Sequence, residues 1–460
     1  MGTLFKNSIF NLFGTLISLI LGVISIPVIF KFLGSEKFSI ISIYLTLIAI
    51  GNIADLGVGK AIIKKLNSTT SISLKKKYFT SGIFFCFIIS LVFVLLNLLI
   101  LNMITFSNIN YYHITKFSLY LIPTLILIIF FKSIIESKNN FFLVNIIRLI
   151  FNILLFGFII FAAYSKFDII IILSIINLIK LLQLITTFIF SRSIFFGMFF
   201  SRKEFYELSV SSVKLGVLNF MGTLIGYVDK LILPMILSAS IIAPYYLVND
   251  ISSKLWLLPG AIFSALFPSL MKFPEKFSNK SFLKKINRIL IFSFAPVIII
   301  VSGFSDEIIK ILSSGALDET TSIYLKITLV GVLISCFNQL NSNILIAYNR
   351  ENEMIKFQTI LFFIYLPVLY FSVQYYGLFG ACYAFSIRLL IDSVIISILS
   401  FKHTKYYFKI ESLFVLLSIL ILVFGVVFRN SIFNSIILII SCFIFIYYLK
   451  KSWKKLIIAN

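Results

Sequence analysis

Fourteen long apolar segments follow one another along the 460-residue chain, with only short loops between them. Each is rich in Ile, Leu and Phe and, at roughly 20 residues, can cross a bilayer as a helix. None alternates polar and apolar residues as a transmembrane barrel strand does. The sequence therefore predicts an all-α polytopic membrane protein with segments at 8–32, 39–57, 79–101, 117–135, 141–164, 169–191, 209–236, 243–268, 286–303, 323–348, 355–376, 377–400, 412–428 and 433–449.

The composition excludes a soluble protein. Hydrophobic residues make up 60% of the chain, charged residues 12%, and the mean hydropathy is +1.08. An ordinary globular domain has about 45–50% apolar and about 25% charged residues. This chain has too little polar surface to cover itself in water, and its short loops leave no room for a soluble domain.

Cysteine and histidine provide no pattern for a metal or cofactor site. The four cysteines lie inside apolar segments, where such residues most often serve packing. The two histidines, His113 and His403, have no Cys or carboxylate at metal-ligand spacing. The phosphate-binding pattern Gly-x-x-x-x-Gly-Lys-Ser/Thr does not occur. No metal, no cofactor and no direct use of ATP are therefore expected.

The basic residues are distributed unevenly between the two predicted sides of the membrane. Of the 40 Lys and Arg residues, 27 fall on the side of the N-terminus, 6 on the other, and 7 within the segments. Because basic loops stay in the cytoplasm, both termini are expected to be cytoplasmic. The net charge of +23 is then mainly a topology signal, and no nucleic-acid partner is expected. The first segment lacks a cleavage site and is interpreted as a retained span, not a signal peptide.

The chain also shows a weak internal repeat. The run Ile26-Pro27-Val28-Ile29 resembles Leu233-Pro234-Met235-Ile236, about 205 residues later. An even number of segments separates the two runs, so the halves share one orientation, as in parallel transporter repeats. The predicted domains are an N-terminal lobe at 1–200, a C-terminal lobe at 201–408, and peripheral spans with a basic cytoplasmic tail at 409–460.

The N-terminal residues show a family resemblance. They include Asn11-Leu-Phe-Gly14, Pro27, Phe32-Leu33-Gly34, Tyr44 and Asp55-Leu56-Gly57 followed by Ala61 and Lys64-Lys65. Further matches are Gly222 with Asp229-Lys230, Tyr245-Tyr246 with Lys254, and Gly377-Leu-Phe-Gly380-Ala381. Together they resemble polysaccharide flippases, the O-antigen and lipid-linked oligosaccharide translocases of the multidrug/oligosaccharidyl-lipid/polysaccharide exporter superfamily. The resemblance extends to about residue 400 and departs where the family often carries arginine in place of Lys64-Lys65.

This resemblance implies two six-helix lobes in a pseudo-twofold, MATE-like arrangement, with two further C-terminal helices. It implies a non-enzymatic flippase of the bacterial cytoplasmic (inner) membrane that works by alternating access, with an ion gradient as its drive. The implied cargo is a glycan on undecaprenyl pyrophosphate, such as an O-antigen repeat unit, carried from the inner to the outer leaflet. Membrane lipid and other polysaccharide-assembly membrane proteins are the implied partners.

The charged residues inside the segments are the candidate site. Each costs about 2.5–3.5 kcal/mol on insertion scales, so each should face a wet cavity or a partner. The net positive charge of the set suits an anionic cargo such as pyrophosphate. The candidates for a cationic substrate-binding cavity are Arg148, Lys180, Lys254, Arg388, Lys230 and Lys214. The candidates for ion coupling or gating are Asp55, Asp229, Asp250 and Asp392.

Structural roles for some of these charges stay open. Asp250 and Lys254 are four residues apart, as are Arg388 and Asp392, so each pair can neutralise itself on one helix face. Lys214 lies near a segment end, where a lysine can extend its ammonium to the interface.

Two other classes of function also remain. A cation-coupled multidrug exporter would share the architecture but should have an acidic cavity. A membrane polysaccharide polymerase or ligase should have a large outer loop, and this chain has none in the predicted topology.

Overall fold

The computed structural model describes residues 2–51, 56–69, 71–103, 109–138, 140–191, 199–272, 283, 294–348 and 350–404. Every regular element in this part of the chain is a helix, as predicted. Seven stretches are long and apolar enough to cross a membrane, which confirms a multi-pass membrane protein. The predicted spans at 412–428 and 433–449 lie outside the described residues, so the count of fourteen stays a prediction.

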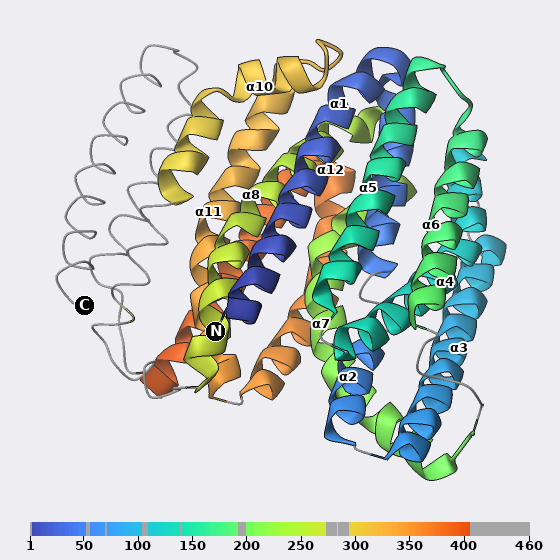
Figure 1. Cartoon of the computed structure of the whole chain (residues 1–460). Helices are drawn as coiled ribbons and strands as arrows, with labels where there is room; N and C mark the ends of the chain where they lie inside the picture. Colours follow the sequence, from blue (N-terminus) through green and yellow to red (C-terminus); the bar gives the residue numbers. More distant parts are fainter. Residues whose placement is uncertain are drawn as a thin grey trace. The chain divides into compact units, whose positions relative to one another are not determined.

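The helices form two compact units, Met1–Ala243 and Pro244–Asn460 (Figure 1). The first unit holds α1 (Gly2–Gly51), α2 (Val58–Ser68), α3 (Ile72–Met103), α4 (Ile109–Ser137), α5 (Phe141–Tyr164), α6 (Ile169–Ser191) and α7 (Arg202–Ile236). Helix α8 (Ala239–Lys272) crosses the boundary. The second unit continues with α10 (Ser305–Leu312), α11 (Thr320–Ala347) and α12 (Glu351–Thr404).

Two pairs of predicted spans are each joined by a single glycine. Helix α1 contains the predicted span 8–32 and the predicted span 39–57 as far as Gly51, with a break at Gly34. Helix α12 contains 355–376 and 377–400, with a break at Gly377. Their φ angles of 79° and 57° lie in the left-handed region, which glycine adopts at little cost. The chain therefore changes direction between spans without a loop.

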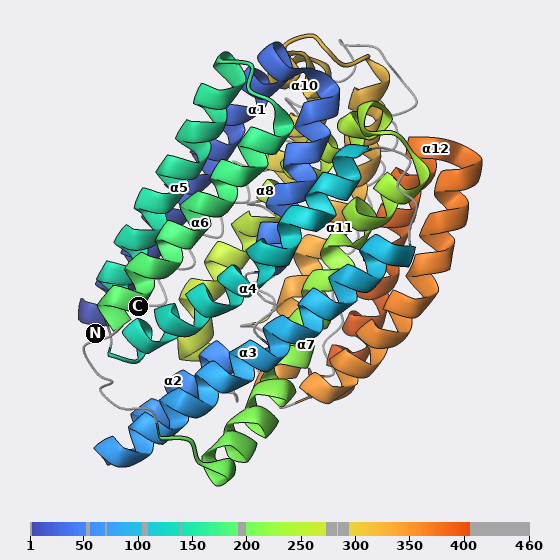
Figure 2. The same cartoon turned by 90° about the vertical axis from the view of Figure 1, so that its right-hand side faces the viewer.

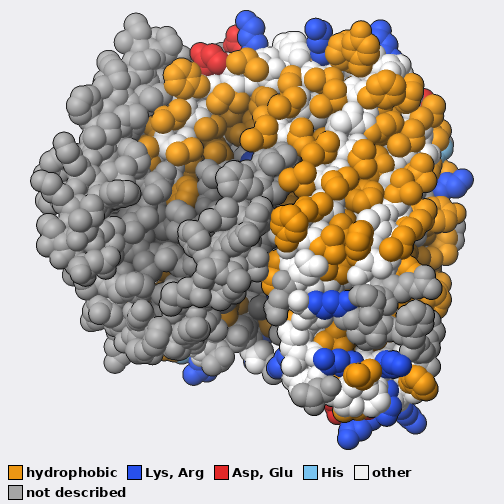
Figure 3. Space-filling view, viewed as in Figure 1, with side chains coloured by type: hydrophobic (Ala, Val, Ile, Leu, Met, Phe, Trp, Pro, Cys, Tyr) orange, Lys and Arg blue, Asp and Glu red, His pale blue; other side chains and the backbone are white. Residues whose placement is uncertain are grey.

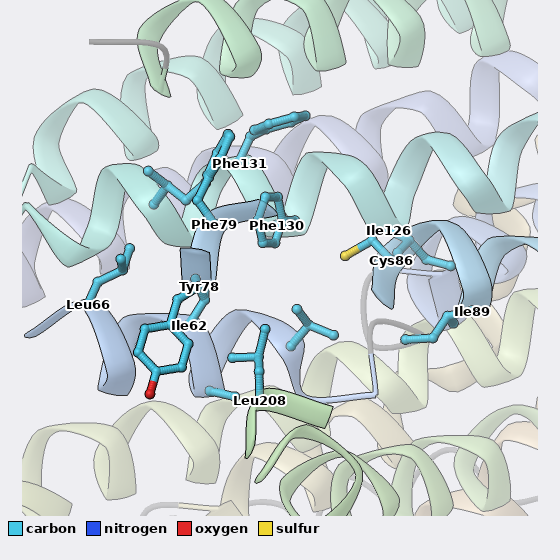
Figure 4. Packing of buried hydrophobic residues seen from close by; sticks show 13 residues of the cluster. Ile62, Leu66, Tyr78, Phe79, Cys86, Ile89, Ile126, Phe130, Phe131 and Leu208 are labelled. Atoms are coloured by element: carbon cyan, nitrogen blue, oxygen red, sulfur yellow. The ribbon is translucent and has the colours of Figure 1, made fainter. Parts of the chain in front are cut away.

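Helix α2 differs from the sequence prediction, which assigned residues 58–78 to a loop. Its apolar residues Val58, Ala61, Ile62 and Leu66 are buried and recur at helical spacing. They join a core cluster with residues of α3, α4 and α7, including Tyr78, Phe130 and Leu208 (Figure 4). Because this stripe is short and interrupted by lysines, a search for continuous apolar spans overlooks it.

Helix α7 packs against α1, α2 and α3 and therefore belongs to the first unit (Figure 2). The turn at Leu56 and Gly57, with φ angles of 46° and 77°, lies directly against it. A Cβ atom on Gly57 would lie 2.7 Å from the Gly216 nitrogen, and one on Gly216 would overlap the Leu56 backbone. Two glycines thus let a turn and a helix touch through their backbones. The predicted lobe boundary near residue 200 stays a prediction.

A serine repeat joins α11 to the second half of α12 in the second unit. Ser386 and Ser393 donate hydrogen bonds to the carbonyl oxygens of Ile327 (2.8 Å) and Ile334 (3.4 Å). Ser400 donates to Asn341 Oδ1 at 2.9 Å. The partners in all three bonds are 59 residues apart, so the two helices run parallel. Small residues every seven positions allow this close approach.

Candidate substrate-binding site

Helix α6 carries a polar stripe along its buried face. Lys180, Gln183, Thr187 and Ser191 are buried within an otherwise apolar helix. Lys180 is 5% exposed, and its ammonium donates a hydrogen bond to Gln183 Oε1 at 3.1 Å. Among the described residues this neutral amide is its polar partner. An ammonium has three donors, so Lys180 retains the capacity to bind an anion.

The stripe continues at Asn177, one turn before Lys180. The Tyr44 hydroxyl of α1 donates to Asn177 Oδ1 at 2.5 Å. Asn177 Nδ2 in turn donates to the backbone oxygen of Phe117 on α4 at 3.2 Å. These bonds connect three helices around the start of the stripe and fix the rotation of α6. The direction of Lys180 is fixed with it.

Arg148 lies on α5 and is half-buried. Its Nη2 donates to Asn145 Oδ1, one turn earlier, at 2.8 Å. The residues next to the two cations, Ile147 on α5 and Ile179 on α6, pack in one buried cluster. Arg148 and Lys180 therefore each lie next to a member of this cluster, on two helices that pack against each other. The structure thus brings these two predicted residues into one region of the first unit.

The other predicted residues of the first unit lie on α7 or before α2. Asp229 is fully buried and Lys230 is 3% exposed, so neither side chain is open to solvent. Lys214 lies on α7, but its side chain is outside the described part. Asp55 also falls outside the described residues.

Arg388 forms the cationic centre of the second unit. It is 6% exposed, and its guanidinium carbon lies 5.1 Å from the ring centres of both Tyr365 and Phe385. Tyr365 comes from the first half of α12, and Phe385 and Arg388 come from the second half. Cation–π contacts with two rings restrain the guanidinium plane.

Asp392 lies one turn after Arg388 and accepts a hydrogen bond from Asn338 Nδ2 of α11 at 2.5 Å. The Asn338 Oδ1 atom is buried and has no hydrogen-bond partner among the described residues. On α8, Asp250 and Lys254 are both half-buried. No group of three or more His, Cys, Asp or Glu side chains is placed to hold a metal within the described ranges.

Sequence reasoning missed Asn177, Gln183 and Asn338, which contact or flank the predicted charges. Their signal was present, because Asn177, Lys180 and Gln183 recur every third residue in an Ile- and Leu-rich helix. Amides carry no charge, so the cost of placing charges in the membrane does not single them out. A polar residue one helical turn from an intramembrane charge is the pattern that reveals such partners.

An ion-paired cluster joins α2, α3 and α7 at one end of the first unit. Lys65 Nζ and the Tyr78 hydroxyl both donate to Glu207 Oε2, each at 2.8 Å. The hydrogen bond from Lys65 lowers the pKa of Glu207, and the same bond raises the pKa of Lys65. Nearby, Lys77 pairs with Glu204 at 3.8 Å, and Ser201 donates to that same carboxylate.

The Lys65–Glu207 pair is expected to stabilise the fold at neutral pH but not in acid. The lowered pKa of Glu207 means that its contribution is present above its unfolded value of about 4.3 and disappears as the pH falls through the folded value. The pair is partly exposed, with side chains 23% and 36% accessible, so its coupling should be only about 0.2–1 kcal/mol. A double-mutant cycle with Lys65→Met and Glu207→Gln, measured by unfolding, checks this. Equal coupling at pH 7 and pH 3 would contradict it.

The chain belongs to the family described as "Polysaccharide biosynthesis protein", whose profile matches residues 4–273. It is 25% identical over 421 residues to a Shigella flexneri protein named "Putative O-antigen transporter", covering 88% of this chain and 99% of that protein. These matches confirm the family resemblance seen in the sequence. The names of these relatives describe biosynthesis of polysaccharide and transport, and none names a catalytic activity.

Solved structures show the same fold. The lipid II flippase MurJ, in an inward closed conformation, matches with a TM-score of 0.74 and 18% identity, over 98% of this chain and 99% of that one. An inward-facing MATE multidrug transporter matches at 0.66 with 11% identity, over 84% and 94%. A Pyrococcus furiosus transporter of the MOP superfamily, described as having reverse polarity of its binding pocket, matches at 0.56 with 10% identity, over 88% and 95%. The predicted MATE-like fold is confirmed.

Proposed function

We propose that this protein flips an undecaprenyl-pyrophosphate-linked glycan, such as an O-antigen repeat unit, from the inner to the outer leaflet of the cytoplasmic membrane. The observation that carries the proposal is the buried Lys180, whose described polar partner is the neutral Gln183. A charged ammonium at such a site is costly unless an anion or water meets it. The family and its O-antigen transporter relative support a glycan cargo.

The diphosphate is the part of the cargo that these residues can recognise. Arg148 and Lys180 carry a guanidinium and an ammonium on two packed helices of the first unit. A guanidinium can bind a phosphate oxygen pair through two parallel hydrogen bonds, and an ammonium adds a compact point charge. In the second unit, Arg388 is restrained by two aromatic rings and is ready for the same chemistry. Lys254, Lys230 and Lys214 complete the proposed cationic set.

Alternating access requires a source of energy, and we assign it to an ion gradient. Asp392 provides one oxygen in the second unit, and Asn338 provides another, its Oδ1, which has no hydrogen-bond partner among the described residues. The Asp392 carboxylate can take up a proton, and both oxygens can coordinate a small cation. Asp229, Asp250 and Asp55 are the other carboxylates proposed for coupling or gating.

A multidrug exporter is the second candidate, because a MATE transporter shares the fold. Exporters of cationic drugs should present carboxylates, whereas Lys180 and Arg388 are buried cations. The Pyrococcus furiosus transporter, with its reported reverse polarity, supports the view that this fold also accommodates other pocket charges. The charge of the buried residues favours the glycan flippase.

Reconstitution tests the function directly. Full-length protein in proteoliposomes is expected to move an undecaprenyl-pyrophosphate-linked oligosaccharide from one leaflet to the other, as measured by access of an added lectin. A fluorescent cationic drug should not be transported in the same vesicles. Transport of the drug without the glycan would favour the exporter. Restoration of surface polysaccharide in a flippase-deficient strain provides the cellular measurement.

The proposed orientation, with both termini cytoplasmic, has its own test. Reporter fusions after about residues 70, 200, 280 and 405 should be cytoplasmic, because the surrounding loops are basic. Fusions after about residues 110 and 312 should be external. A cytoplasmic reporter at 312 would show that the assignment of the second half is wrong.

A further inference from the structure

The first unit ends in a surface of basic side chains, hereafter the basic surface: Lys60, Lys64, Lys75, Lys76, Arg202 and Lys203. Lys60 and Lys64 are exposed, as are Arg202 and Lys203, and Lys75 and Lys76 are half-buried. Figure 3 shows Lys and Arg side chains gathered near the end of this unit where α2 and α3 meet, beyond a broad hydrophobic band.

The basic surface is distinct from the ion-paired cluster beside it. Residues 58–80 and 199–210 contain eight basic and two acidic residues, which leaves a net charge of +6. Both acids, Glu204 and Glu207, pair with Lys77 and Lys65. Within the described residues, neither Lys60, Lys64 nor Arg202 forms a hydrogen bond or ion pair through its side chain. These cations are available to an external anion.

Helix α2 presents its lysines outward for a structural reason. Its apolar stripe is already buried in the core of the first unit through Ala61, Ile62 and Leu66. Lys60 and Lys64, four residues apart, therefore share the opposite, exposed face. An amphipathic helix of a peripheral protein usually buries its apolar face in the bilayer. Helix α2 instead buries its apolar face in the protein and exposes Lys60 and Lys64.

Apolar side chains lie exposed among these cations. Ile72 is 70% exposed, Phe200 is 55% exposed, and Tyr206 is 70% exposed. Exposed aromatic and aliphatic side chains beside lysines are typical of the membrane interface, where rings sit at the level of the headgroups. An acidic protein partner would explain the cations but would not require this apolar rim.

We propose that the basic surface binds anionic phospholipid headgroups of the leaflet that surrounds this end of the first unit. Phosphate oxygens would meet Lys60, Lys64 and Arg202, while Ile72 and Tyr206 enter the interface beside them. The bound lipids would form a stable contact with the α2–α7 region. This inference does not depend on the proposed flippase activity, because it concerns lipid outside the transport path.

Lipid retention by the purified full chain tests the proposal. We expect native mass spectrometry to show preferential retention of phosphatidylglycerol over phosphatidylcholine of the same acyl chains. Substituting Lys60, Lys64, Lys75 and Arg202 by Gln should reduce that preference by about fivefold per charge. A matched control substitutes Lys31, Lys116, Lys166 and Lys310, which are exposed elsewhere, and should retain the wild-type preference. A variant in which Lys60, Lys64 and Lys75 are replaced by Arg keeps the charge and should also retain the wild-type preference for phosphatidylglycerol.

Ionic strength provides a second measurement that needs no variant. Raising the salt from about 0.01 M to about 0.15 M shortens the screening length from about 30 Å to about 8 Å, so phosphatidylglycerol retention by the wild type should fall. Equal retention of the two lipids would overturn the proposal. So would an unchanged preference in the Gln variant, or an equal loss in the control variant, since the contact would then not belong to this surface.

Discussion

The Gly216→Ala variant is expected to fail to accumulate in the membrane. A Cβ atom at this position would overlap the backbone carbonyl of Leu56, and backbone cannot rotate away as a side chain can. The turn at Leu56 and Gly57 or helix α7 must then move, which opens the core between α2 and α7. We expect a loss of more than about 3 kcal/mol, at the large end for single substitutions. Membrane protein level and thermal unfolding measure it.

Gly226 on the same helix provides the matched control. A Cβ there would have no atom within 4 Å, and replacing a helical glycine by alanine usually stabilises a helix by about 1 kcal/mol. Gly226→Ala should therefore accumulate at least as well as the wild type. Equal behaviour of the two variants would show that the contact between α7 and the Leu56 turn is not required for folding.

Loss of both cations in the first unit is expected to abolish most transport without loss of protein. Each substitution removes a hydrogen bond to an amide, that of Arg148 to Asn145 and that of Lys180 to Gln183. It also replaces an intramembrane charge, which is costly to insert, by the residue with the highest helix propensity, so the Arg148→Ala, Lys180→Ala variant should insert normally. Hydrogen bonds to a charged group contribute about 1.5–3 kcal/mol each, so each substitution should lower transport about 10- to 100-fold. Transport of the lipid-linked glycan in proteoliposomes, normalised to protein, gives the measurement.

The conservative variants separate charge from shape. Lys180→Arg and Arg148→Lys should keep part of the activity, with the lysine at 148 the poorer substitute if the guanidinium binds two oxygens. Lys116→Ala, which removes an exposed cation, is the control and should transport normally. Full activity in the double variant would show that these cations do not bind the cargo.

The fold was predictable from sequence because hydropathy dominates a chain in lipid. Hydropathy did not predict α2, because its apolar residues form a short stripe interrupted by lysines. The single-residue turns at Gly34 and Gly377 were visible only as segment boundaries, since their backbone angles leave little trace beyond a glycine. The contact between Gly57 and Gly216 could not be predicted from one sequence, because it joins residues that are distant along the chain.

Some residues of the candidate site were predictable from the sequence, and their contact partners were not. Intramembrane charges are costly and rare, so Lys180 and Arg388 were identifiable by their residue type alone. Their partners Gln183, Tyr365 and Phe385 depend on how helices rotate about their axes. Only the Lys180–Gln183 contact could have been predicted locally, because the two residues lie three positions apart on one helix. Tyr365 lies too far from Arg388 in sequence for any local pattern to connect them.

The packing of α7 into the first unit has a consequence for synthesis. Leu208 completes the buried cluster of α2, α3 and α4, yet it is translated after helices α1 to α6. At about 5–20 residues per second, the 35 residues of α7 take about 2–7 s to emerge. During that interval the cluster of α2, α3 and α4 lacks Leu208 and stays incompletely covered. The first unit can therefore close only after the ribosome has started the second half of the chain.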